Sequence, residues 1–225
     1  MKSALAWEWR TVDSYRQETT IRHMPQLDVT QRVLRLAGRR GSITRQEVIG
    51  AGIHTQVLSR LVHAGTLERV SRGHYRLPDA PTTEHHGLAL VAVGVPKAMI
   101  CLLSALSYHG VGTQLPHEVW IAIDRRSRRP ALSYPKLRVL RFSGQALSEG
   151  IETHRIEGET VKVYGVAKTL ADLFKYRNKI GLDVCLEALR DAWSARRFNM
   201  KEIHRYAEIC RVERVMRPYL EALVG

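Results

Sequence analysis

Five polar side chains fall close together in the sequence, at a spacing that suits hydrogen bonding to DNA bases. They are Thr55, Gln56, Ser59, Arg60 and His63. On a helix spanning roughly 55–64 they share one face, because Leu58, Leu61 and Val62 form the opposite, apolar stripe. Amide, hydroxyl and guanidinium groups bind base edges and phosphates in DNA grooves. The pattern therefore predicts a DNA-reading helix.

The residues around this segment predict a helix-turn-helix that would position it. Thr44 and Glu47 have the spacing of a capping box, in which a hydroxyl and a carboxylate each bind a free backbone N–H at a helix start. Gly52 permits a sharp turn after this short helix, and Gly65 can end the second helix in the left-handed conformation. An amphipathic helix over 28–37 precedes the pair and supplies the first helix of a three-helix unit.

A basic hairpin follows the second helix of the pair. Residues 67–70 and 74–77 have the composition of two short strands, separated by a turn at 71–73. Helix, turn, helix and hairpin is the layout of a winged helix-turn-helix, which we place at 27–78. Its expected DNA contacts outside the reading helix are Arg45, Arg69, Arg72 and His74. Two surface helices and a hairpin with an ordinary solvated face are the alternative.

The charge of the chain favours a polyanionic partner. Over 225 residues the formal net charge is +13, and residues 28–77 alone hold nine arginines against three acids. Such a surplus attracts nucleic acid and makes binding salt-dependent. No apolar run approaches the roughly 18 residues of a membrane span, and the start of the chain lacks the apolar stretch of a secretory signal. The three cysteines have no metal-binding spacing, so we expect reduced thiols in a cytoplasmic protein.

Beyond the winged unit the sequence predicts a larger second domain. Residues 1–26 are interpreted as an N-terminal arm, and 78–81 as a short, stiff linker containing proline. We expect the second domain over 82–225 to have an α+β fold, with a small mixed sheet packed among helices. The expected helices cover 82–94, 97–108, 166–176, 182–196, 200–209 and 212–223. The expected strands cover 118–123, 137–142, 152–156 and 161–164.

A second basic cluster lies in the loop after the first of these strands. It contains Arg125, Arg126, Arg128 and Arg129, and no acid occurs between 125 and 141. Cations this close repel one another unless phosphates neutralise them, so we expect this loop to contact DNA. A loop that is simply exposed to solvent is the alternative at this point.

Acidic residues in the second domain raise the alternative of a metal-dependent nuclease. Asp124 ends a strand and Glu152 begins another, while Glu157 and Glu159 lie in the hairpin turn that precedes Lys162 in the next strand. The spacing does not support a nuclease, because residues three apart in an extended strand lie on opposite faces. The ten histidines show no HExxH spacing, and the chain has no phosphate-binding or dinucleotide-binding glycine motif. We therefore expect no catalytic residue, no metal and no cofactor, with a nucleic-acid-processing enzyme as the alternative.

Four segments carry a resemblance to a known family. They are GTLERVSRGHYRL (65–77), ICLLSALSYHG (100–110), VWIAI (119–123) and VYGVAKTLADLFKYRNKIGLD (163–183). Together they resemble the AbiEi-type antitoxins of abortive-infection toxin–antitoxin systems. The resemblance covers nearly everything from residue 28 onward, and the hairpin segment is the least specific of the four.

The resemblance implies a function as well as a fold. AbiEi-type antitoxins are transcriptional autorepressors that bind inverted repeats in the promoter of their own operon, and their C-terminal domain counters a nucleotidyltransferase-like toxin without requiring a stable complex. It therefore implies double-stranded DNA and such a toxin as partners of this chain. Repeated DNA sites suit either a weak dimer or monomers that bind in turn. An RNA-binding accessory factor is a further alternative, suggested only by Trp120 and Tyr164.

Overall fold

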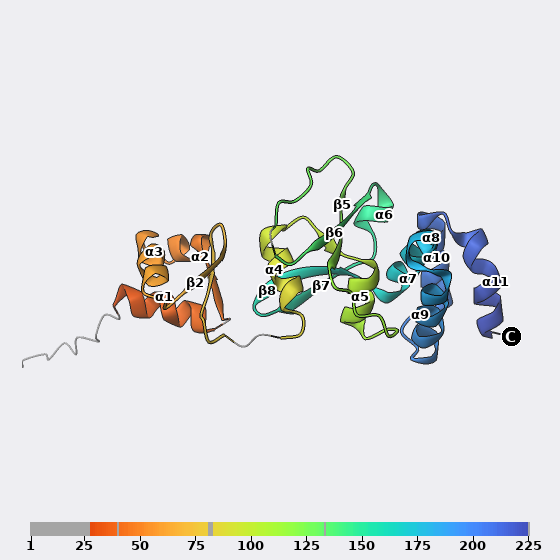
Figure 1. Cartoon of the computed structure of the whole chain (residues 1–225), viewed down its shortest axis with the longest axis horizontal. Helices are drawn as coiled ribbons and strands as arrows, with labels where there is room; N and C mark the ends of the chain where they lie inside the picture. The colour runs from red at the N-terminus through yellow and green to blue at the C-terminus, as the bar shows by residue number, and fades with distance from the viewer. Residues whose placement is uncertain (1–27, 40, 81–82, 133, 225) are drawn as a thin grey trace, which may run out of the picture.

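The computed structural model describes residues 28–39, 41–80, 83–132 and 134–224. The predicted N-terminal arm lies outside the described residues, as does part of the predicted linker. The described chain forms two units with separate hydrophobic cores, a smaller N-terminal unit and a larger C-terminal unit. In Figure 1 the N-terminal unit lies at one end, the sheet of the C-terminal unit lies in the middle, and the last helices lie at the other end.

The N-terminal unit consists of three helices and a small sheet. Its helices are α1 (Val29–Gly38), α2 (Arg45–Gly50) and α3 (Gln56–His63). Its antiparallel strands, in the order β1-β3-β2, are β1 (Ser42–Thr44), β2 (Glu68–Ser71) and β3 (His74–Arg76). The three predicted helices and the predicted hairpin are confirmed, whereas β1 was not predicted. Pairing with β3 makes β1 the third strand of the sheet.

The predicted capping box is present at the start of α2. The hydroxyl of Thr44 accepts the N–H of Glu47 at 3.1 Å, and the carboxylate of Glu47 accepts the N–H of Thr44 at 2.8 Å. Ile43 just before this cap and Val48 just after it are both buried, so the entry of the chain into α2 is also fixed by apolar packing. The helix-turn-helix therefore begins where the sequence predicts.

The C-terminal unit is built on a five-stranded mixed sheet. Its strands are β4 (Met99–Ile100), β5 (Val119–Asp124), β6 (Leu137–Phe142), β7 (Ile151–Ile156) and β8 (Glu159–Tyr164). They lie in the order β6-β5-β4-β8-β7. The β5–β6 and β4–β8 pairs are parallel, and the other two pairs are antiparallel. The predicted α+β class with a mixed sheet is confirmed.

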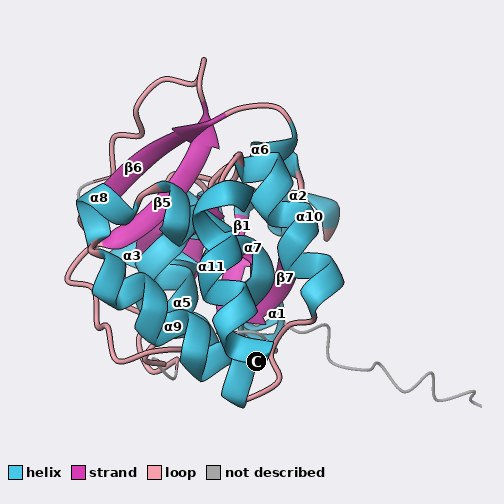
Figure 2. Cartoon of the chain, turned by 90° about the vertical axis from the view of Figure 1, so that its right-hand side faces the viewer, coloured by secondary structure: helices cyan, strands magenta, loops and turns pink. Residues whose placement is uncertain are grey.

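Helices cover both faces of this sheet. They are α4 (His86–Gly94), α5 (Leu102–His109), α6 (Gln145–Ser148), α7 (Val166–Lys175), α8 (Arg177–Ile180), α9 (Leu182–Ser194), α10 (Met200–Cys210) and α11 (Glu213–Val224). Ile121 and Val163 join the core on the α4 side, whereas their neighbours Ala122 and Tyr164 join the core against the C-terminal helices. The split follows from the alternation of side chains along a strand. Figure 2 shows α9, α10 and α11 in front of the sheet.

One predicted helix, over 97–108, is wrong in its first part. Ile100 lies in β4, at the centre of the sheet, and pairs with Ile121 on one side and Val163 on the other. The helix begins only at Leu102. A short apolar run has no periodicity that separates a buried strand from a buried helix, and only the pairing partners decide between them. The short helices α6 and α8 were not predicted.

Candidate nucleic-acid interface

One face of α3 is polar and accessible. Its exposed side chains are Gln56, Ser59, Arg60 and His63. Thr55, at the start of the helix, is half-buried and does not cap it with its side chain. Leu58 and Leu61 on the opposite face are buried in the core of the N-terminal unit. The packing of α3 therefore leaves the predicted reading face open to a partner.

Local hydrogen bonds fix two positions on this polar face of α3. Nδ1 of His54 accepts the N–H of Gln56 at 3.3 Å, which satisfies one of the free donors at the helix start. Nδ1–H of His63 donates to the carbonyl oxygen of Ser59 at 2.8 Å, so the neutral ring presents Nε2 as an acceptor. The face therefore combines amide, hydroxyl and guanidinium groups with one imidazole acceptor, a set that suits base edges and phosphates.

The β2–β3 hairpin forms a wing beside α2. Arg69 and Arg72 on this hairpin are exposed. Gly73 at its turn has φ of +84°, a conformation that residues with a side chain adopt rarely. The carbonyl oxygen of Gly73 accepts the N–H of Arg45 at 2.7 Å. This bond fixes the wing tip against the start of α2 and places the exposed Arg45 beside it.

His74 differs from the other predicted DNA contacts. It lines a cavity between the two units, and its Nδ1 atom is buried with no hydrogen-bond partner among the described residues. Arg76, two residues along the same strand, lines the same cavity and donates to the carbonyl oxygen of Ala80 at 2.7 Å. β3 therefore directs both side chains toward the C-terminal unit, and the placement of His74 favours a role between the units over a DNA contact.

The Arg-rich loop leaves the sheet at the end of β5 and projects away from it in Figures 1 and 2. Its exposed arginines are Arg125, Arg126, Arg128 and Arg129. The Arg141 guanidinium donates to the carbonyl oxygens of Arg125 at 2.9 Å and Ser127 at 2.7 Å, which ties the loop backbone to β6. Within the described chain no carboxylate forms an ion pair with these four guanidinium groups.

The acidic residues considered for nuclease chemistry have separate roles. Asp124 accepts the N–H of Arg126 at 2.7 Å, and Glu152 lies 3.2 Å from Nε2 of His154. Glu159 accepts the hydroxyl of Ser42 at 2.8 Å. Among the described residues no group of three or more His, Cys, Asp and Glu side chains could hold a metal ion. Within the same part of the chain, no helix has the length and apolar character needed to cross a membrane.

A buried ion pair in the C-terminal unit was not predicted. Lys168 and Asp172, one turn apart on α7, are 0% exposed, and Nζ lies 2.5 Å from Oδ2. The second carboxylate oxygen accepts the S–H of Cys210 at 3.1 Å, and Nζ lies 4.2 Å from the centre of the Tyr164 ring. Burial raises the pKa of Asp172 above its ordinary value, against the opposing effect of the Lys168 charge. A sequence signal for the pair exists, because these two charges lie four residues apart in the segment 166–174, whose other residues are apolar except Thr169.

Fold and geometry together define an α+β protein with an N-terminal helix-turn-helix unit of the winged type. The sequence model of the family described as "Transcriptional regulator, AbiEi antitoxin" matches residues 31–78, which lie within that unit. The predicted resemblance to AbiEi-type antitoxins is thus confirmed over this segment. The match supports a role as a regulator of the antitoxin kind.

A solved structure is similar to this chain over more of its length than the family model matches. The crystal structure of the RV2827C protein from Mycobacterium tuberculosis is similar, with a TM-score of 0.54 at 15% sequence identity, over 80% of this chain and 71% of that chain. At this identity the similarity establishes a shared fold and no more. No curated protein matches the chain.

Proposed function

We propose that this protein is a sequence-specific double-stranded DNA-binding autorepressor and the antitoxin of a toxin–antitoxin operon. The observation that carries the proposal is the exposed polar face of α3, on a unit that matches an antitoxin-regulator family. In this proposal α3 enters the major groove of inverted repeats in the protein's own promoter. The protein acts in the cytoplasm, where its operator and its toxin are found.

The proposed contacts divide into two kinds. Gln56 and Arg60 on α3 have side chains that can form paired hydrogen bonds with adenine and guanine, so they read sequence. Arg72 on the wing and the four arginines of the loop contact phosphates and add affinity without sequence information. Arg45 and Arg69 flank the same surface and belong to the second kind.

The first test compares variants of these two kinds. Gln56→Ala and Arg60→Ala should each weaken binding to the operator duplex by about 1–3 kcal/mol, because a paired hydrogen bond to a base is lost, and should change binding to a scrambled duplex much less. Arg72→Ala should weaken binding to both duplexes alike. Fluorescence anisotropy with the two labelled duplexes measures both effects. Lys201→Ala, on the exposed face of α10, is the control. Equal losses on both duplexes for Gln56→Ala and Arg60→Ala would refute the assignment of sequence reading to α3.

The antitoxin half of the proposal requires a separate test. We propose that the C-terminal unit counters a nucleotidyltransferase-like toxin without a stable complex. The double variant Arg60→Ala/Arg72→Ala, expressed from a constitutive promoter, should still relieve the growth arrest caused by the toxin, because neither residue lies in the C-terminal unit. Loss of rescue in parallel with loss of DNA binding would refute this division.

We also propose that the protein is a monomer or a weak dimer in solution. The large exposed apolar side chains of the described chain are spread over five segments, at Val29, Ile49, Leu115, Tyr134 and Leu182. Scattered apolar residues of this kind do not form the contiguous patch of an obligate interface. Light scattering over a concentration series tests the proposal, and a mass of two chains at the lowest concentration would overturn it.

A further inference from the structure

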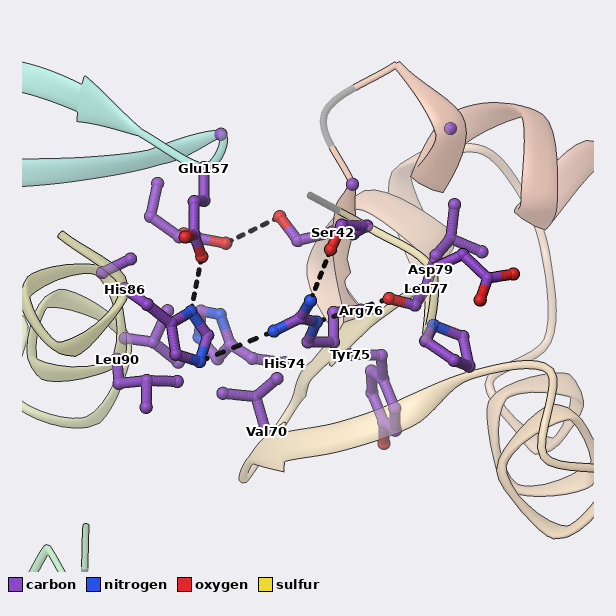
Figure 3. A pocket seen from close by; sticks show the side chains of 18 of the residues that line it. Ser42, Val70, His74, Tyr75, Arg76, Leu77, Asp79, His86, Leu90 and Glu157 are labelled. Carbon is purple, nitrogen blue, oxygen red and sulfur yellow. Dashed lines mark hydrogen bonds and ion pairs between the residues drawn. The ribbon is translucent and has the colours of Figure 1, made fainter. Parts of the chain in front are cut away.

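A cavity of about 900 Å³ lies between the two units, and nothing in the proposed function uses it. Its N-terminal wall comes from α1 and the β1-β3-β2 sheet, and its C-terminal wall comes from α4 and the β7–β8 turn (Figure 3). Cavities that bind small molecules have volumes of several hundred Å³ and occur preferentially between domains. Its size and position therefore make it a candidate ligand site.

Hydrogen bonds within and between the units engage Glu157 and Glu159, two carboxylates that line the cavity. Ser42 donates to Glu159 at 2.8 Å across the boundary. Glu157 accepts the N–H of Thr83 at 2.7 Å and Nδ1–H of His86 at 2.6 Å. Burial acts to raise the pKa of Glu157, but these hydrogen bonds outweigh it and the pKa is lowered, so the carboxylate stays charged. The carboxylates of Glu157 and Glu159 are thus bonded to groups of the protein itself, so the cavity needs no bound cation to satisfy them.

Two polar groups on β3 have hydrogen-bonding capacity that the described chain does not fully use. Nδ1 of His74 is buried and has no hydrogen-bond partner in the described chain. Nη1 of Arg76 reaches Nε2 of His86 only at 3.5 Å, a contact at the limit of a hydrogen bond (Figure 3). Because Nδ1 of His74 is buried, a ligand in the cavity meets the Arg76 guanidinium instead. A carboxylate suits this group, because it accepts strong hydrogen bonds from a guanidinium.

The rest of the lining is mostly apolar. Its apolar side chains include Leu34, Val70, Tyr75, Leu77, Leu90 and Val93, which come from both units, and the charged residues Arg39, Asp79 and Arg155 also line it. Apolar walls of this kind favour binding of an aromatic ring over binding of a sugar or a phosphate.

We propose that this cavity binds a small aromatic carboxylate, with its carboxylate on Arg76 and its ring among the apolar walls. Arg76 lies on β3, which directly follows the wing turn at Gly73, so a bound ligand contacts the strand that carries the wing. The bound ligand therefore changes the affinity of the protein for its operator. This last step rests on the proposed function, whereas binding of the ligand does not.

The test uses 1-naphthoate as the probe and the full chain. Naphthoate should bind saturably, as followed by its fluorescence, and 1-naphthalenemethanol, which has the same ring system without the charge, should bind at least tenfold more weakly. Leu90→Trp fills the cavity and should weaken naphthoate binding at least tenfold, whereas Leu90→Ala should retain it. Arg76→Met should remove the preference for naphthoate over the alcohol. Leu115→Trp, which adds the same side chain at a position that is 83% exposed, is the control.

The outcomes separate this inference from the proposed function. The inference is overturned if naphthoate shows no saturable binding, even if the protein binds its operator. It is also overturned if Leu90→Trp and Arg76→Met both bind naphthoate as tightly as the wild type. Binding that depends on Leu90 and Arg76 in a protein that does not bind its operator supports the cavity and overturns the repressor. Naphthoate should shift the operator dissociation constant of the wild type severalfold and that of Leu90→Trp much less. An unshifted wild-type constant at saturating naphthoate overturns the regulatory step.

Discussion

At the scale of single residues, the pair of Lys168 and Asp172 is the most consequential feature of the C-terminal unit. Both side chains are fully buried, and removing two charges from water is unfavourable unless each is paired and hydrogen-bonded. Cys210 satisfies the second carboxylate oxygen, and the Tyr164 ring lies against the ammonium. The pair thereby joins α7 to β8, which directly precedes it, and to α10, whose Cys210 is 38 residues from Asp172.

Removing one partner should destabilise the protein strongly. We expect Lys168→Ala to lower the free energy of unfolding by about 3–5 kcal/mol, because Asp172 is left buried without a counter-charge. The loss should shrink as the pH falls, since burial raises the pKa of Asp172 and its protonated form carries no charge. Urea denaturation at pH 7.5 and pH 5 measures both effects.

A double variant provides the control for this prediction. Lys168→Met/Asp172→Leu removes both charges and keeps most of the volume, so it should be less destabilised than Lys168→Ala. A larger loss in the double variant would mean that the shape of these side chains, and not their charge, stabilises α7.

At the scale of elements, His109 connects the end of α5 to β8. Its Nε2–H donates to the carbonyl oxygen of Tyr164 at 2.9 Å, and its ring meets that of Tyr108 edge-on at 5.3 Å. Burial lowers the pKa of His109 from its ordinary value of 6.5, and the hydrogen bond to Tyr164 does not cancel this effect. The folded protein therefore favours the neutral ring at this junction.

Acidification should weaken the junction between α5 and β8. As the pH falls below 6.5, the unfolded chain takes up a proton on His109 before the folded chain does, so the free energy of unfolding decreases. His109→Gln keeps a donor but cannot titrate, and its stability should vary less between pH 7 and pH 5 than that of the wild type. Thermal denaturation across this range measures the difference, with the exposed His204→Gln as the matched control. Identical pH dependence in His109→Gln and the wild type would contradict the prediction.

At the scale of the whole molecule, the net charge of +13 is distributed over both units. The N-terminal unit presents the arginines of α3 and the wing, and the C-terminal unit presents the Arg-rich loop. Each cation that contacts a phosphate releases counterions, so the contribution of the loop to DNA binding can be measured without knowledge of the operator.

Neutralising the loop should reduce the salt dependence of DNA binding. If all four arginines contact phosphates, the variant with Arg125, Arg126, Arg128 and Arg129 each changed to Gln should lower the slope of log K against log salt by about 3–4. Its preference for operator over scrambled duplex should be unchanged. The matched control changes four exposed cations between α9 and α11 to Gln, namely Arg190, Arg196, Lys201 and Arg214, which removes the same charge. An equal reduction in slope for both variants would exclude a specific role for the loop.

The two units differ in how far they can be predicted from the sequence. In the N-terminal unit the capping box of Thr44 and Glu47, the end of α3 and the hairpin all follow from signals within a few residues of one another. In the C-terminal unit most helices and strands are also predicted, but β4 is not. Its two residues form a strand only because β5 and β8, which follow it in the sequence by about twenty and sixty residues, lie on either side of it.

The sequence by itself determined the class of the fold, the polar face of α3 and the excess of positive charge, because these depend on local periodicity and composition. Only the tertiary structure decided that Lys168 and Asp172 are buried, and that His74 meets the C-terminal unit. Charged and polar residues are expected at the surface, and that expectation fails where distant segments pack over them. Asp172 and Cys210, which are 38 residues apart, form one hydrogen bond that no local pattern specifies. Burial is a property of the assembled chain, and it is burial that sets the chemistry of these side chains.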